Sequence, residues 1–214
     1  MFINCIVAAS PDYNRVNILN PTVPPLQLTE LDHIPEGLLE RPASALYQQL
    51  PGPTLIHLEG RLKRPLVVSV LQHGNEITGW EAIRRLLKSH YQRDELPRSL
   101  VIFIGNPVAA RQRLRRLDDQ PDFNRCWPGG NEPDSEYTRL FRRIHDRLLE
   151  LRPMAVIDVH NNTGLNPHYA ALNRIRSDYL RLASMFSPKV VYLSLIHISE
   201  PTRRRDSSRM PASA

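Results

Sequence analysis

Blocks of apolar residues separated by polar segments predict buried strands along the central part of the chain. Residues 54–60 and 65–71 predict two strands joined by a polar turn. The second of these blocks is almost wholly apolar, as expected of a strand buried on both faces. Residues 100–104 and 154–159 predict two more buried strands, and residues 189–192 a short one. These blocks predict a sheet with a buried centre.

Helical periodicity fills the intervals between the predicted strands. Residues 134–151 place apolar side chains on one stripe, and Asp134 or Ser135 can cap the start of this helix. Residues 77–87 show the same three-to-four spacing, and a further helix is expected near residues 177–186. Strands that alternate with helices indicate an α/β fold, a layered sheet with helices on both faces.

The two ends of the chain differ from this pattern. Residues 1–53 contain many of the 19 prolines, which limit regular structure, so we expect a Pro-rich extension with a short helix near residues 43–49. The main domain is expected over residues 54–192. Residues 193–214 resemble the translation of a sequencing-library transposon adaptor followed by an Arg/Ser-rich run. We expect an artefactual, disordered tail that supplies no functional residue.

Composition narrows the class of protein. The 214 residues are 41% hydrophobic and 23% charged, which is ordinary for a soluble globular protein. No apolar run reaches the roughly 18 residues needed to cross a bilayer, and the chain opens without a basic signal region, so we expect a cytoplasmic protein without a membrane partner. Cys5 and Cys126 are the only cysteines, which excludes a disulfide scaffold and a four-thiolate zinc site. Any metal must therefore be held by His and carboxylate groups.

The net charge of +6 invites a nucleic-acid partner. However, the four arginines of residues 193–214 outnumber the two acidic residues there, so the rest of the chain carries +4. Because the body is only mildly basic, we expect no nucleic-acid partner.

Three polar clusters follow directly on predicted buried strands. They comprise residues 72–76, 106–125 and 160–163. Ligands collect at the carboxyl ends of strands in open α/β sheets, so these clusters could converge. His73, Glu76 and His160 together form a ligand set of two His and one Glu, which is typical of catalytic zinc. The alternative is that His73 and Glu76 form an ordinary turn and His160 is a hydrogen-bonded histidine at a strand end.

Three motifs in order resemble those of the succinylglutamate desuccinylase/aspartoacylase family, which belongs to the zinc carboxypeptidase-like amidohydrolases. They are His73-Gly74-Asn75-Glu76, the segment from Asn106 through Arg115 to Asp122-Phe123-Asn124-Arg125, and Asp158-Val159-His160-Asn161-Asn162-Thr163. The resemblance covers residues 54–192. It implies a mixed, mainly parallel sheet with helices on both faces, incomplete at the C-terminus of this chain.

The resemblance also implies a ligand set. His73, Glu76 and His160 would bind one Zn²⁺ per chain. Asp158 stands two residues before His160 and could orient it, although a buried Asp at a strand end is as often simply hydrogen-bonded.

Three polar residues of the middle motif would bind substrate. The resemblance assigns Arg115, Asn124 and Arg125 to the substrate carboxylate, and Arg125 also to catalysis, by polarising the scissile carbonyl. A guanidinium group suits both tasks, because it binds a carboxylate through two hydrogen bonds and can stabilise an oxyanion. Arg113 is the fallback for Arg115, because the interval before Asp122 is longer than the family pattern.

The implied activity is that of a zinc-dependent hydrolase, a deacylase acting on the amide or ester bond of a small N-acylated amino acid or related carboxylate. The family takes its general-base Glu from a later Glu-x-Gly-like segment, which this chain lacks, so we expect impaired activity. One alternative is a metallocarboxypeptidase acting on peptides. Another is a non-catalytic metal- or nucleic-acid-binding module in which the arginines of residues 111–116 form a solvated basic face. The oligomeric state stays open.

Overall fold

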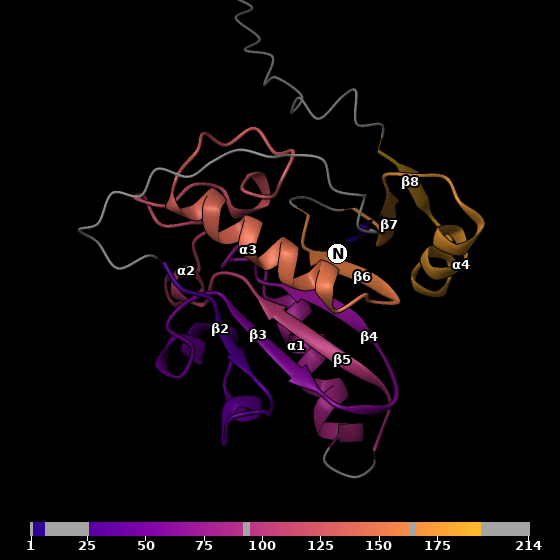
Figure 1. Ribbon diagram of the computed structural model, residues 1–214, viewed down its shortest axis with the longest axis horizontal. Helices are drawn as coiled ribbons and strands as arrows, with labels where there is room; N and C mark the ends of the chain where they lie inside the picture. The colour runs from indigo at the N-terminus through magenta and orange to yellow at the C-terminus, as the bar shows by residue number, and fades with distance from the viewer. Residues whose placement is uncertain (1, 7–25, 92–94, 163–165, 194–214) are drawn as a thin grey trace, which may run out of the picture.

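The computed structural model describes residues 2–6, 26–91, 95–162 and 166–193 (Figure 1). The described residues form one eight-stranded sheet in the order β2-β3-β5-β4-β6-β1-β7-β8. The strands are β1 (Phe2–Ile6), β2 (Thr29–Leu31), β3 (Thr54–Leu58), β4 (Gly60–Val70), β5 (Leu96–Ile104), β6 (Ala155–His160), β7 (Tyr169–Leu172) and β8 (Val190–Tyr192).

The sheet is mixed and mainly parallel, as predicted. The β3–β5 and β6–β1 pairs are antiparallel, and the other neighbouring pairs are parallel. The predicted strand blocks correspond to β3, β4, β5, β6 and β8. The expected tail lies, apart from Leu193, outside the described residues.

Three strands were not predicted. The prolines before residue 54 predict irregular chain, which is wrong for β1 and β2, and β7 lies between the predicted strand at 154–159 and the predicted helix at 177–186, where a polar loop was expected. β1 lies between β6 and β7, where Phe2 pairs with His160 on one side and with Tyr169 on the other. The N-terminal segment therefore completes the sheet beside the strand that carries His160.

Four α-helices and several short helical turns connect the described strands. They are α1 (Thr78–Leu86), α2 (Pro107–Gln112), α3 (Glu136–Glu150) and α4 (Ser177–Phe186), with 3₁₀ turns η1 (Leu38–Glu40), η2 (Ala43–Gln48) and η4 (Phe123–Arg125) and a π turn η3 (Leu87–Tyr91). The predicted helices are confirmed as α1, α3, α4 and η2. Ser135 caps α3 through a reciprocal capping box with Thr138.

Helices cover both faces of the sheet, which confirms the predicted layering (Figure 1). On one face α3 packs into an aromatic and aliphatic cluster, which includes Val67, Val101, Phe103, Phe141 and Ile144. On the other face α1, α4, η1 and η2 pack together in a second cluster, which includes Leu46, Ile56, Val68, Trp80 and Tyr179. Successive side chains along β4 and β5 point to opposite faces of the sheet, so they pack alternately into the two clusters.

β8 forms one edge of the sheet, and all three of its side chains are exposed. Among the described residues, no helix combines the length and apolar character required to span a membrane.

Candidate metal centre

The three predicted ligands meet at the carboxyl ends of β4 and β6, which are parallel neighbours in the sheet. His73 and Glu76 lie in the turn between β4 and α1, and His160 is the last residue of β6. Their ligand atoms all lie within 4.8 Å of one another, and the three residues are buried, with 2%, 7% and 2% of their surface exposed. The described chain thus brings together a group that can hold a metal ion.

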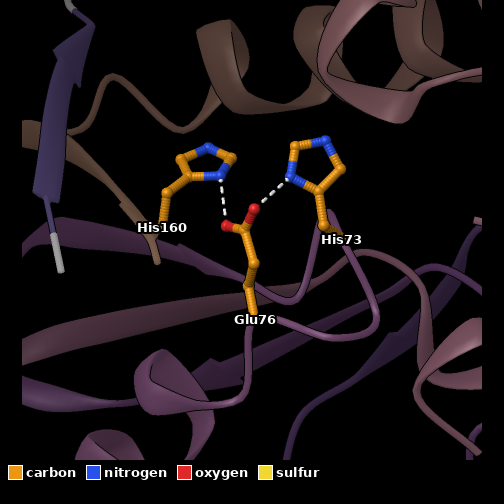
Figure 2. Close-up of side chains that lie close together, drawn as sticks. All are labelled: His73, Glu76 and His160. Atoms are coloured by element: carbon orange, nitrogen blue, oxygen red, sulfur yellow. Dashed lines mark hydrogen bonds and ion pairs between the residues drawn. The ribbon is translucent and has the colours of Figure 1, made fainter. Parts of the chain in front are cut away.

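Glu76 stands between the two imidazole rings (Figure 2). Its Oε1 lies 2.8 Å from Nδ1 of His73, and its Oε2 lies 2.8 Å from Nδ1 of His160. The backbone N–H of Asn161 donates to the same Oε2 at 2.9 Å. Both imidazoles therefore present Nδ1 to the interior of the centre.

A second carboxylate holds the far nitrogen of each ring. Nε2 of His160 lies 2.7 Å from Oδ2 of Asp158, and Nε2 of His73 lies 2.8 Å from Oδ1 of Asp122. Carboxylates that bind the outer nitrogen of a histidine fix the orientation of the ring and leave the inner nitrogen for a metal.

The electrostatics of the centre favour ionised side chains. Burial opposes the charge of Glu76, but His160 and His73 outweigh it and lower the pKa of Glu76 to about 2. Burial likewise opposes the charge of His160, but Asp158 and Glu76 raise its pKa to about 10. His73 follows the same balance, because Asp122 and Glu76 outweigh burial and raise its pKa. These shifts favour the protonated form of both rings, in which each ring donates from both nitrogens to carboxylate oxygens.

This donor set fits a divalent cation. A metal ion would replace the two Nδ1 protons that point at Glu76, so it would bring the same charge into the centre as it displaces. Its ligands would be two imidazole nitrogens and a carboxylate oxygen, which suit zinc.

The turn that carries His73 and Glu76 is braced by the segment around α2. The backbone N–H of Gly74 donates to the carbonyl oxygen of Arg115 at 3.1 Å. A Cβ atom at Gly74 would lie only 2.3 Å from the backbone nitrogen of Ala110, so this approach requires glycine. The segment of the middle motif thus packs against the turn of the first motif and holds that turn in place.

Of the predicted substrate-binding residues, Arg115 contacts the centre with its side chain, whereas Asn124 and Arg125 lie beside Asp122 in the chain. Arg115 lies 3.0 Å from Oδ2 of Asp122 through Nη2 and 3.5 Å from Oε1 of Glu76 through Nη1. Asn124 and Arg125 lie in η4, and Asp122 caps this turn by accepting from the Asn124 backbone N–H at 3.0 Å. The roles of these three residues toward a substrate stay predictions.

The other arginines of residues 111–116 point to different partners. Arg111 lies over the ring of Tyr47, with 4.6 Å between its Cζ atom and the ring centroid. Arg113 is exposed at the C-terminal end of α2, and Arg116 donates to the carbonyl oxygen of Gln120 at 2.6 Å. Within this segment Arg115 is thus the arginine paired with Glu76.

Sequence reasoning left one carboxylate of the centre without a role. Asp122 stands in the middle motif, yet its contact with His73 spans 49 positions of sequence. The signal in the sequence was its position two residues before Asn124, because an Asp at such a position can cap a turn with its carboxylate.

Comparison with known proteins gives the family. Residues 64–212 match the model of the succinylglutamate desuccinylase/aspartoacylase catalytic domain. The crystal structure of succinylglutamate desuccinylase from Vibrio cholerae is similar with a TM-score of 0.36 and 14% identity, over 53% of this chain and 30% of that one. That similarity is too low to bear on fold or function, and no curated protein matches the chain. Because the family model covers more than half of the sequence, the chain belongs to the succinylglutamate desuccinylase/aspartoacylase family, a family of deacylases.

Proposed function

We propose that this protein is a zinc-dependent deacylase that hydrolyses the amide bond, or an ester bond, of a small N-acylated amino acid or related carboxylate. The observation that carries the proposal is the convergence of the His73, Glu76 and His160 ligand atoms within 4.8 Å in a buried centre. Family membership supports the deacylase class. The chain spans 30% of the length of the solved desuccinylase, so the activity and substrate of the whole protein are part of this proposal.

His73, Glu76 and His160 would hold the zinc, each through one atom. When bound, zinc supplies Lewis-acid polarisation of a carbonyl and makes a water molecule more acidic. Asp122 and Asp158 would keep the two imidazoles oriented, because each accepts a hydrogen bond from the outer ring nitrogen.

Arg115 is suited to bind the substrate carboxylate. Its side chain is 46% exposed while its guanidinium group contacts the centre. A planar guanidinium can bind a carboxylate through two parallel hydrogen bonds. In the structure Nε and Nη2 of Arg115 both donate to one oxygen, Oδ2 of Asp122. Asn124 would add a hydrogen bond to the same carboxylate. Arg125 would stabilise the negative charge that develops on the carbonyl oxygen in the transition state.

Metal content tests the first part of the proposal. We expect about one zinc per chain in the purified protein by elemental analysis. His73→Ala and His160→Ala should abolish binding, because each removes a ligand. His33→Ala is the matched control, since the side chain of His33 is 66% exposed and pairs only with its neighbour Asp32 among the described contacts. A folded parent protein that takes up no zinc would refute the metal site.

Substrate hydrolysis tests the second part. N-acylated aspartate and glutamate should be cleaved faster than an acyl amide of the same size without a carboxylate. Arg115→Gln should lower kcat/KM for the carboxylate substrates by roughly 10- to 100-fold, as expected for the loss of a charge-assisted hydrogen bond. The same variant should leave the amide without a carboxylate almost unaffected. An equal loss on both substrates would assign Arg115 to the stability of the centre rather than to recognition.

A further inference from the structure

A line of hydrogen bonds leads from the hydrophobic core under α3 to the candidate metal centre. We propose that Gln72 and Trp127 are positioning residues of this centre: Trp127 sets the orientation of the Gln72 amide, and Gln72 holds Asp158, which orients His160. The inference rests on the proposed function only for the identity of the metal.

The contacts are short and continuous. The indole N–H of Trp127 donates to Oε1 of Gln72 at 2.6 Å. Nε2 of Gln72 donates to Oδ2 of Asp158 at 2.6 Å and lies 3.3 Å from the hydroxyl of Ser69. The same Oδ2 lies 2.7 Å from Nε2 of His160. Each member of the line therefore touches the next.

The chemistry of the two ends allows only one orientation of the amide. An indole N–H can only donate, and an ionised carboxylate can only accept. A flipped Gln72 would direct its oxygen at Asp158 and its NH₂ group at the indole N–H, so it would lose both bonds. Because Gln72 is 3% exposed and Asp158 is 2% exposed, water cannot replace the lost partners.

Asp158 depends on this arrangement. Its other oxygen, Oδ1, is buried without a hydrogen-bond partner among the described residues. Oδ2 therefore receives both Gln72 and His160. If Gln72 turned away, this carboxylate would keep His160 and Ser69 but lose one of the partners that fix it, so it could rotate and change the direction of the ring.

The aromatic core fixes the direction of the indole. The ring of Trp127 packs edge-on against Phe141, at 4.9 Å between centroids, and against Phe103, at 5.8 Å. Phe141 comes from α3 and Phe103 from β5. The backbone N–H of Gly130 also donates to the Trp127 carbonyl oxygen at 2.8 Å, which closes the loop after η4. The contacts with Phe141 and Phe103 thus fix the indole ring in the orientation in which its N–H reaches Gln72.

The test compares two tryptophan variants. Trp127→Phe keeps an aromatic ring and removes the N–H group, and it should raise the Kd for zinc severalfold, up to the roughly 10-fold that loss of a direct partner of a metal ligand costs. Trp80→Phe is the matched control, because its indole N–H donates at 3.0 Å to the Arg41 carbonyl oxygen, in the core cluster on the opposite face. It should leave the Kd for zinc unchanged. Affinity is measured by competition with a chromophoric chelator at matched folding. Equal Kd values for the parent and Trp127→Phe would overturn the proposal.

A double-mutant cycle tests whether Trp127 acts through Gln72. Gln72→Met removes the amide and keeps a side chain of similar length. In that background Trp127→Phe should change the Kd for zinc by less than twofold. If the two single effects multiply in full, Trp127 acts on the centre by another route and the proposed line is wrong.

A readout on the metal-free protein separates this inference from the proposed function. The Nε2 proton of His160, observed by NMR, reports its hydrogen bond to Asp158 directly. Its signal should shift in Trp127→Phe and stay in place in Trp80→Phe. If the parent binds no zinc, the proposed function fails, and the positioning role is decided by this signal alone. An unchanged His160 signal in Trp127→Phe would then overturn it.

Discussion

Replacing Gly74 by Ala should displace the turn that carries His73 and Glu76. A Cβ atom at this position would lie 2.3 Å from the backbone nitrogen of Ala110 and 2.4 Å from the carbonyl carbon of Ala109. Both neighbours are main-chain atoms of α2, so neither can rotate away. The turn and α2 must therefore separate.

The size of this displacement follows from the contact distances. Non-bonded carbon atoms rest at about 3.5 Å or more, so the backbones must move apart by about 1 Å. Overpacking of this kind costs typically about 1–3 kcal/mol of folding free energy. The movement also strains the 3.1 Å hydrogen bond from the Gly74 N–H to the Arg115 carbonyl. We expect weaker zinc binding in addition, because the displaced turn would move His73 and Glu76 relative to His160.

Chemical denaturation of the metal-free protein measures the first effect, and zinc titration measures the second. Gly52→Ala is the control, because no atom lies within 4 Å of a Cβ at that position. It should leave the free energy of unfolding and the Kd for zinc close to those of the parent. If Gly74→Ala behaves like Gly52→Ala in both assays, the close approach of the turn to α2 does not exist in solution.

Three further predictions follow from the structure. The metal-free protein should lose stability as the pH falls from about 5 toward 2, because the native pKa of Glu76, about 2, lies below the ordinary value of 4.5. Thermal unfolding should show a smaller loss of stability over this pH range in Glu76→Gln. An equal loss in the variant and the parent would contradict the assigned ionisation of Glu76. Ser135→Ala should cost about 0.5–2 kcal/mol by removing the cap of α3, measured by denaturation, and a change below 0.3 kcal/mol or so would mean that the cap is replaced. Cys126 is buried, and burial raises the pKa of its thiol to about 12. Iodoacetamide should therefore leave this thiol unmodified at pH 8 or so in the folded protein and alkylate it only after unfolding, as measured by mass spectrometry.

The strands and helices that could be predicted are those whose own sequence is periodic. β4 is nearly all apolar along its second half, and α3 places its apolar residues on one stripe, so the burial of each element can be predicted from its own sequence. β1 and β7 are five and four residues long, and they gain their structure from pairing with each other and with distant strands. No local pattern encodes such pairing. α2 is different, because Asn106 as cap and Pro107 at the first position are a start signal that was present in the sequence.

The same division applies to the candidate site. His73, Glu76 and His160 could be found because each follows a predicted strand, and the carboxyl ends of parallel strands share one edge of the sheet. Asp122 and Trp127 reach the centre from a loop without periodicity, across 49 and 55 positions of sequence. Their contacts depend on how the loop closes over the sheet, which spacing alone does not specify.

The charges of the centre explain how it can be buried both with and without metal. Glu76, Asp122 and Asp158 supply three negative charges, and Arg115 with the protonated rings of His73 and His160 supplies three positive ones, all joined by hydrogen bonds or ion pairs. Buried charges are tolerated when they are paired in this way. A divalent cation that displaces two imidazole protons leaves the sum unchanged, so the fold can hold the ligands in place before the metal arrives. Removing a single carboxylate breaks that balance in both states, and for this reason the carboxylates behind the histidines should matter to the centre as much as the ligands do.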